Sequence, residues 1–255
     1  MKKPRLSIQN IYSMKSHYNL ILVVVLIIFG CSLTSTAIAE VQTTVRFQPP
    51  PESEQPKDTE GAASRQTERC PANSLVADSD RPNIEPRLTA VVPPTNRGLT
   101  TAERPNLWIY LPETSAQQAI LTIKQNGKIP HWQQTVAIAN TTGVVGIKLS
   151  EAAPSLEIGR DYQWAIILVC GDRPSPNDPV ITSWIERVAP KNNSAKSGLE
   201  EASTYAQQGI WYDALDALIA EKSSLPNWQD IWSEYLESTG LEQIADRPVI
   251  YDFFQ

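Results

Sequence analysis

The sequence predicts a mainly β protein with a helical end: an antiparallel β-sandwich followed by a small C-terminal helical segment. Short apolar stretches separated by Pro, Gly and polar residues fill positions 87–188. An Asn-Gly pair at 126–127 divides one long stretch into two. Beyond residue 190 the apolar residues recur at the three- and four-residue spacing of helices. Strands first and helices afterwards indicate an α+β arrangement with separate layers.

The expected strands follow one another without an intervening helical pattern. They lie within RLTAVV (87–92), NLWIYLP (106–112), QQAILTIKQNGKIPHWQQTVAI (117–138), VVGIKL (144–149), DYQWAIILVC (161–170) and PVITSWIERV (179–188). Asn126-Gly127 predicts a two-residue hairpin turn, because both turn positions require positive φ. Six or seven short strands in about a hundred residues are typical of an antiparallel sandwich.

One motif indicates which class of β-sandwich the sequence forms. LEIGRDYQW places Leu156, Gly159, Tyr162 and Trp164 in the arrangement L-x-x-G-x-x-Y-x-W. This arrangement resembles the tyrosine corner of immunoglobulin-like sandwiches, in which a Tyr hydroxyl returns to the backbone just upstream. The alternative is an ordinary hairpin with an aromatic strand. We therefore expect an immunoglobulin-like β-sandwich, with Gly159 allowing a tight crossover.

Three apolar stripes follow the polar connector APKNNSAKSG. They are Leu199, Ala202, Tyr205 and Ala206; Trp211, Ala214, Leu215, Leu218 and Ile219; and Trp228, Ile231, Trp232, Tyr235 and Leu236. Tyr205, Ala214, Leu218 and Pro226 have the spacing of the later part of a tetratricopeptide (TPR) repeat, but the opening half and a second copy are missing. The sequence predicts one TPR-like helical hairpin and a third helix, packed on the sandwich.

The beginning of the chain predicts export. Basic residues precede the apolar run LILVVVLIIF (20–29), and small residues end at Ala39. This order is typical of a secretory signal peptide over residues 1–39, cleaved after Ala39. We expect a periplasmic or extracellular protein. Two alternatives attach it to a membrane: an uncleaved signal anchor, or lipidation of Cys31.

Residues 40–69 are rich in Pro, Glu and Gln, which predicts a disordered linker. The sandwich domain is assigned to residues 70–189 and the helical segment to 190–255. Cys70 and Cys170 remain after the signal is removed, and an even number of cysteines in an exported protein favours a disulfide. The alternative is two unrelated thiols.

Composition argues against several classes of function. Without residues 1–39, 18 basic residues face 28 acidic ones, a formal charge of −10 that disfavours nucleic acid as a partner. His131 is the only remaining His, and no G-x-S-x-G motif supplies a nucleophile. We therefore assign no catalytic, cofactor-binding or metal-binding residue. Asp172, Asn177 and Asp178 share a loop but lack the spacing of a calcium loop.

Several motifs together resemble a known family. They are RCP, TTAERPNLWIYLP, LEIGRDYQW, ILVCGD, ITSWIERV and GIWYDALDAL. These motifs are similar to those of a cyanobacterial family, domain of unknown function 928, over roughly Cys70 to Asp246. The resemblance implies an exported protein of the cyanobacterial envelope. It implies no activity, substrate or catalytic residue.

Two classes of function remain. The first is a non-catalytic envelope module that binds a protein or a glycan, and the absence of nucleophile, metal and cofactor motifs favours it. The second is a hydrolase whose site is assembled from scattered carboxylates, since acidic residues distant in sequence can meet in space. Two close carboxylates with perturbed acidity in a cleft would favour the hydrolase.

Overall fold

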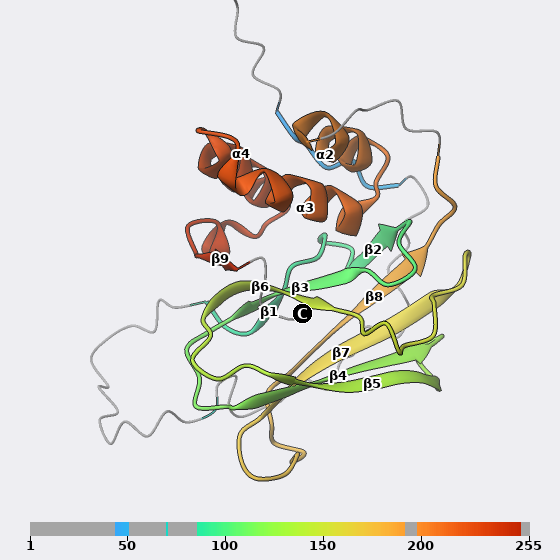
Figure 1. Ribbon diagram of the computed structural model, residues 1–255, viewed down its shortest axis with the longest axis vertical. Coiled ribbons are helices and arrows are strands. Elements are labelled where there is room, and N and C mark those ends of the chain that lie inside the picture. Colours follow the sequence, from blue (N-terminus) through green and yellow to red (C-terminus); the bar gives the residue numbers. More distant parts are fainter. Residues whose placement is uncertain (1–43, 51–69, 71–85, 192–197, 251–255) are drawn as a thin grey trace, which may run out of the picture. The chain divides into compact units, whose positions relative to one another are not determined.

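The computed structural model describes residues 44–50, 70, 86–191 and 198–250. Within these ranges the protein is mainly β, with its helices at the C-terminal end (Figure 1). The strands are β1 (Thr89–Ala90), β2 (Arg97–Thr100), β3 (Asn106–Leu111), β4 (Gln118–Gln125), β5 (Ile129–Ala137), β6 (Gly143–Lys148), β7 (Asp161–Val169), β8 (Val180–Arg187) and β9 (Val249–Ile250). Strands and helices belong to one compact unit, Thr43–Gln255.

The strands form two mixed sheets, ordered β1-β3-β6-β9 and β2-β8-β7-β4-β5. Most neighbouring pairs are antiparallel, but β2 runs parallel to β8 and β9 runs parallel to β6. The expectation of a wholly antiparallel sandwich is therefore wrong at these two pairs. Both β2 and β9 were also missed, because strands of four and two residues show too little alternation to be recognised.

The predicted hairpin between β4 and β5 is confirmed. Asn126 and Gly127 have φ values of 50° and 69°. The Lys128 N–H closes the turn on the Gln125 carbonyl at 3.1 Å. A register shift between Ile123 and Lys124 interrupts the pairing of β4 with β5.

The core lies between the sheets and under the helices. Alternate residues of β7, namely Tyr162, Trp164, Ile166 and Leu168, are fully buried, as its period-two pattern predicts. Strands β3 and β6 are instead buried along almost their whole length. Such continuous burial requires cover on both faces, and α3 (Trp211–Ala220) packs against β3 from the helical side.

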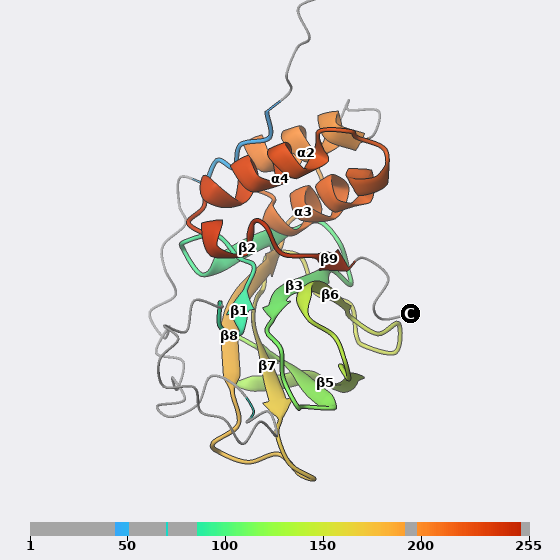
Figure 2. The same ribbon diagram turned by 90° about the vertical axis from the view of Figure 1, so that its left-hand side faces the viewer.

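The helices are α2 (Gly198–Gln207), α3 and α4 (Trp228–Glu237), with short 3-10 turns at Glu221–Ser223 (η1) and Glu242–Ile244 (η2). Figure 2 shows them stacked at one end of the sheets, opposite the β7–β8 connection. Most residues of the predicted apolar stripes are buried, and the others, Leu199 and Tyr205, are partly buried. Among the described helices, none combines the length and hydropathy needed to cross a lipid bilayer.

Residues 44–50 are the described part of the segment 40–69, which the sequence predicts to be a disordered linker. They form an extended segment beside the helices, drawn in blue in Figures 1 and 2. Val45 is buried, Phe47 and Pro50 are half-buried, and the remaining residues of the segment are exposed. Two apolar residues in alternation are enough to anchor a short segment on an existing core. Cys31, Ala39 and the rest of the predicted signal peptide lie outside the described residues.

Candidate functional site

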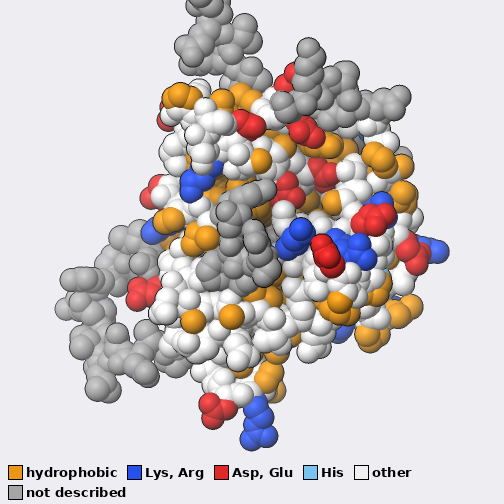
Figure 3. Space-filling model, in the orientation of Figure 1, with side chains coloured by type: hydrophobic (Ala, Val, Ile, Leu, Met, Phe, Trp, Pro, Cys, Tyr) orange, Lys and Arg blue, Asp and Glu red, His pale blue; other side chains and the backbone are white. Residues whose placement is uncertain are grey.

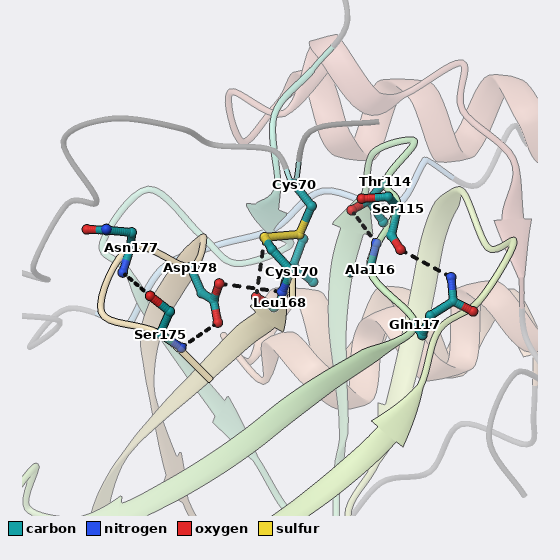
Figure 4. Close-up of a disulfide and its surroundings, with 10 residues drawn as sticks. All are labelled: Cys70, Thr114, Ser115, Ala116, Gln117, Leu168, Cys170, Ser175, Asn177 and Asp178. Carbon is teal, nitrogen blue, oxygen red and sulfur yellow. Dashed lines mark hydrogen bonds between the residues drawn. A yellow bond between two sulfur atoms is a disulfide. The ribbon is translucent and has the colours of Figure 1, made fainter. Parts of the chain in front are cut away.

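A disulfide marks the end of the sandwich farthest from the helices. Cys170 directly follows β7, and its sulfur is bonded to that of Cys70, with 5.1 Å between the Cα atoms (Figure 4). The predicted pairing is thus present in the structure. Cys70 is buried, so the bond fixes this position of the chain against the end of a core strand.

The β7–β8 loop beside the disulfide is held by one carboxylate. Asp178 accepts hydrogen bonds from the backbone N–H groups of Ser175, at 2.8 Å, and Cys170, at 3.4 Å. Asp178 is buried, whereas Asp172 and Asn177 are exposed. The described residues bring together no set of three His, Cys, Asp or Glu suited to a metal ion. The role of the Asp178 carboxylate is therefore structural: its hydrogen bonds fix the conformation of the loop.

The β3–β4 loop lies across from the disulfide. The Ala116 N–H donates to the Thr114 hydroxyl at 3.2 Å, and the Gln117 side-chain amide donates to the Ser115 carbonyl at 3.1 Å. The Ile138 N–H donates to the Gln117 carbonyl at 3.0 Å, which ties this loop to the end of β5. The two bonds within the loop are drawn in Figure 4, beside the disulfide.

A cleft of about 370 Å³ separates the two loops. Its lining residues are Ser115, Gln117, Gln118, Val169, Cys170, Gly171 and Asp172. The lining combines hydroxyl, amide and carboxylate groups with the apolar side chain of Val169, and more of its surface is polar than apolar. Figure 3 shows charged side chains of both signs at the nearby tip of the molecule. Such groups can hydrogen-bond a polar ligand. We call this site the disulfide cleft.

Sequence reasoning named Cys170 and Asp172 but missed Ser115, Gln117 and Gln118. Serine and glutamine in a strand connection belong to no recognised motif, so the sequence does not indicate that these residues line a cleft. The only available signal was topological. In an antiparallel arrangement, the connection before β4 and the one after β7 reach the same end of the sheet.

A carboxylate pair lies at the helix–sheet junction. Asp213 accepts a hydrogen bond from the Thr100 hydroxyl at 2.7 Å and others from the hydroxyl and N–H of Thr101. Asp216, one turn later on α3, accepts from the Trp108 indole N–H at 2.6 Å and from the Asn106 amide at 3.0 Å. These bonds fasten α3 to β2 and β3.

Burial gives Asp216 an unusual acidity. Its pKa is raised to about 7, because loss of solvent disfavours the carboxylate more than its hydrogen bonds from Trp108 and Asn106 favour it. The nearby Asp213 charge adds to the rise. A carboxyl group that titrates near neutrality can exchange protons in catalysis, but here its oxygens are engaged in bonds that support the fold.

The four residues of the predicted tyrosine corner surround the start of β7. The Tyr162 hydroxyl accepts a hydrogen bond from the Glu157 N–H at 3.0 Å, just upstream. Gly159 has a φ of +73°, and Leu156 is buried. The Trp164 indole donates to the Tyr212 hydroxyl at 2.8 Å, joining β7 to α3. Burial raises the pKa of Tyr212, so the group stays a neutral phenol.

His131 has a structural environment. It lies on β5, half-buried, with its Nε2 atom 3.2 Å from the Pro154 carbonyl oxygen and its ring 4.8 Å from that of Tyr162. A backbone carbonyl is no nucleophile, so these contacts do not build a catalytic triad around His131.

The comparisons with known proteins identify a family. The sequence profile described as Domain of Unknown Function (DUF928) matches residues 60–249. The chain belongs to this family, and the match spans both the strands and the helices. No curated protein and no solved structure matches the chain.

Proposed function

We propose that this protein is an exported, non-catalytic binding module whose disulfide cleft holds a glycan. The observation that carries the proposal is the lining of the cleft. Carbohydrates present many hydroxyl groups, and Ser115, Gln118 and Asp172 offer donors and acceptors to them. The volume of about 370 Å³ lies within the range of small-ligand sites. A short oligosaccharide is thus the ligand that suits the cleft.

The disulfide supports export. Disulfides persist in oxidising compartments and are rare in the cytosol, and the Cys70–Cys170 bond agrees with a signal peptide over residues 1–39. We place the protein in the periplasm or outside the cell, in the cyanobacterial envelope that the family resemblance implies. Cleavage after Ala39 releases it, whereas lipidation of Cys31 or an uncleaved signal keeps it on the membrane.

The proposal also includes the class of the sandwich and of the helical segment. The contact between Tyr162 and the backbone near Glu157, together with the arrangement of the strands in two sheets, supports an immunoglobulin-like sandwich. The contact of α2 with the next helix, α3, supports a TPR-like hairpin in the helical segment. Both architectures commonly serve binding, and sandwiches often bind through loops at one end.

A glycan array tests the proposal. The exported protein is applied to bacterial surface oligosaccharides, and the best ligand is titrated by calorimetry against Gln118→Ala and Asp172→Asn. Both side chains are exposed on the cleft. We expect each variant to weaken binding about tenfold, the loss of a hydrogen bond or two. Gln133→Ala, an exposed amide elsewhere on β5, is the matched control. Unchanged affinity in both cleft variants would reject the site.

One observation favours a second candidate, a hydrolase at the helix–sheet junction. Asp216 has a pKa near 7 beside a second carboxylate, Asp213. The same oligosaccharides incubated with wild type and Asp216→Asn distinguish the two functions. Cleavage by the wild type that is lost in the variant would support the hydrolase, and intact ligand with both proteins would support the binding module.

A further inference from the structure

The extended segment 44–50, which we call the strap, touches every helix of the C-terminal segment. Its Gln48 N–H donates to the Ala206 carbonyl at the end of α2, at 3.0 Å. The Phe47 ring meets Trp211 of α3 edge-on, with 4.8 Å between the ring centroids. Arg46 pairs with Glu234 of α4 at 3.1 Å. Three helices thus share one short, extended ligand from the same chain.

The helices present a surface shaped for an extended backbone. At Gly209, between α2 and α3, a Cβ atom would lie 2.8 Å from Pro50 and 3.0 Å from the Gln48 carbonyl oxygen. Gly209 also has a φ of +75°, which side chains rarely allow. The absence of a side chain here lets the strap lie directly on the turn. We call the surface around Ala206, Gly209, Trp211 and Glu234 the strap site.

Recognition at the strap site depends on a simple pattern. Val45 and Phe47 turn inward, while Arg46 points to an acidic side chain at the surface. An exposed ion pair contributes little to affinity, so most of the affinity comes from the two apolar side chains and the backbone hydrogen bond. The strap site therefore recognises an extended apolar–Arg–apolar segment that is followed by proline.

Contacts of this size bind weakly unless they are tethered. The strap stays in place because it belongs to the same chain, which gives it a high effective concentration. A second peptide with the same pattern can therefore compete for the surface. The charges favour such a competitor, since α2 and α4 carry Glu200, Glu201, Asp230, Glu234 and Glu237.

We propose that the strap site is a peptide-docking surface for a partner protein that carries an extended apolar–Arg–apolar segment, and that residues 44–50 are its built-in competitor. When the strap is docked, the partner is excluded. When the partner is bound, the strap is released. The helical end then joins an envelope protein while the disulfide cleft, at the other end of the sheets, holds its own ligand.

A labelled peptide tests the proposal. A fluorescent peptide of residues 44–50, TVRFQPP, is titrated by anisotropy against the exported protein and against Val45→Ser/Phe47→Ser, in which the strap is weakened. We expect the variant to bind the peptide at least about tenfold more tightly than the wild type, because the strap no longer occupies the site. No binding to the variant, or equal affinity for both proteins, would overturn the proposal.

A charge swap tests the site itself. Glu234→Arg in the weakened-strap variant should lower affinity for the peptide about two- to fivefold, and a peptide with Glu in place of Arg46 should recover it. Glu237→Arg is the matched control, because Glu237 lies exposed on the same helix and has no described contact with the strap. Equal effects of the two substitutions would reject recognition at Glu234.

Two further readouts keep the outcomes distinct. Circular dichroism verifies that the weakened-strap variant keeps its helices, and glycan binding at the disulfide cleft is measured on the same samples. If the cleft binds and the strap site does not, this inference fails and the proposed function stands. A wild-type dimer that separates when the strap is weakened would show a second copy as the occupant, and would also overturn the proposal.

Discussion

The disulfide end and the helical end of the protein hold their segments by different interactions. At the disulfide end, the Cys70–Cys170 bond and the hydrogen bonds of Asp178 fix the chain, and a polar cleft remains beside them. At the helical end, Trp211 lies between Phe47 and Tyr235, with 4.8 and 5.2 Å between ring centroids. Directional bonds can hold loops apart, whereas stacked aromatic rings must fill the space they share. The first end therefore suits a polar small ligand and the second suits a chain segment.

The largest expected effect is at the helical end. Trp211→Ala removes a fully buried indole, its contacts with Phe47 and Tyr235, and its 2.8 Å hydrogen bond to the Val91 carbonyl. We expect the free energy of unfolding to fall by about 4 kcal/mol, the usual cost of such a truncation. Urea denaturation measures it. Trp132→Ala, a half-buried indole on β5, should cost less than half as much, and equal losses would contradict the comparison.

The next effect is at the disulfide end. Replacing Cys70 and Cys170 by Ser together should lower the free energy of unfolding by about 3 kcal/mol, because the unfolded chain is no longer closed into a long loop. Urea denaturation of the oxidised wild type and the double variant measures the difference. We expect the tryptophan emission of the folded double variant to stay unchanged, since Trp211 and the rings it contacts lie at the other end. A shifted emission would show that the two ends are coupled.

The smallest effect is at the junction between the ends. Asp216 has a pKa of about 7 in the folded protein against an ordinary value of 3.8, so the folded state binds the proton more tightly. The stability that this proton provides is complete below the unfolded pKa and is lost as pH rises toward 7. Between pH 5 and pH 8 we expect the Asp216 contribution to fall by about 2.5 kcal/mol.

Asp216→Asn should abolish this fall in the free energy of unfolding with rising pH. Asp230→Asn, which removes an exposed carboxylate on α4, should preserve it. Denaturation midpoints at each pH decide the question. A wild-type protein whose stability rises over this interval, with no difference from Asp216→Asn, would place the titrating group elsewhere.

Regular patterns made part of the fold predictable. The alternation in β7, the Asn-Gly turn and the Trp-rich stripe of α4 each repeat a local rule over enough residues to be read from sequence. The strands β2 and β9 follow no such rule. Each is fixed by its partner strand, so β2 forms because Arg97 to Thr100 lie beside Trp184 to Arg187.

The sites were less predictable than the strands. Cys170 was found because cysteine pairing follows from number and compartment. Asp216 was not found, because its raised pKa comes from the burial of its carboxyl group against the sheet, which outweighs the opposing effect of two donors on β3, Asn106 and Trp108. The strap was missed because two apolar residues in a Pro-rich segment look like any linker until the surface that receives them is known.

The parallel pairing of β9 with β6 has a consequence for how the chain folds. Val144 pairs with Val249, and the Val144 N–H donates to the Pro248 carbonyl at 2.7 Å. The described elements between these partners in the chain include β7, β8 and the helices α2, α3 and α4. Contacts between distant positions carry a large loop-closure entropy and form late. The hairpin of β4 and β5 closes over two residues and can form early. Sheet β1-β3-β6-β9 is then completed last, after the helices have brought Val249 back to it, and until that moment β6 exposes an open edge to other chains.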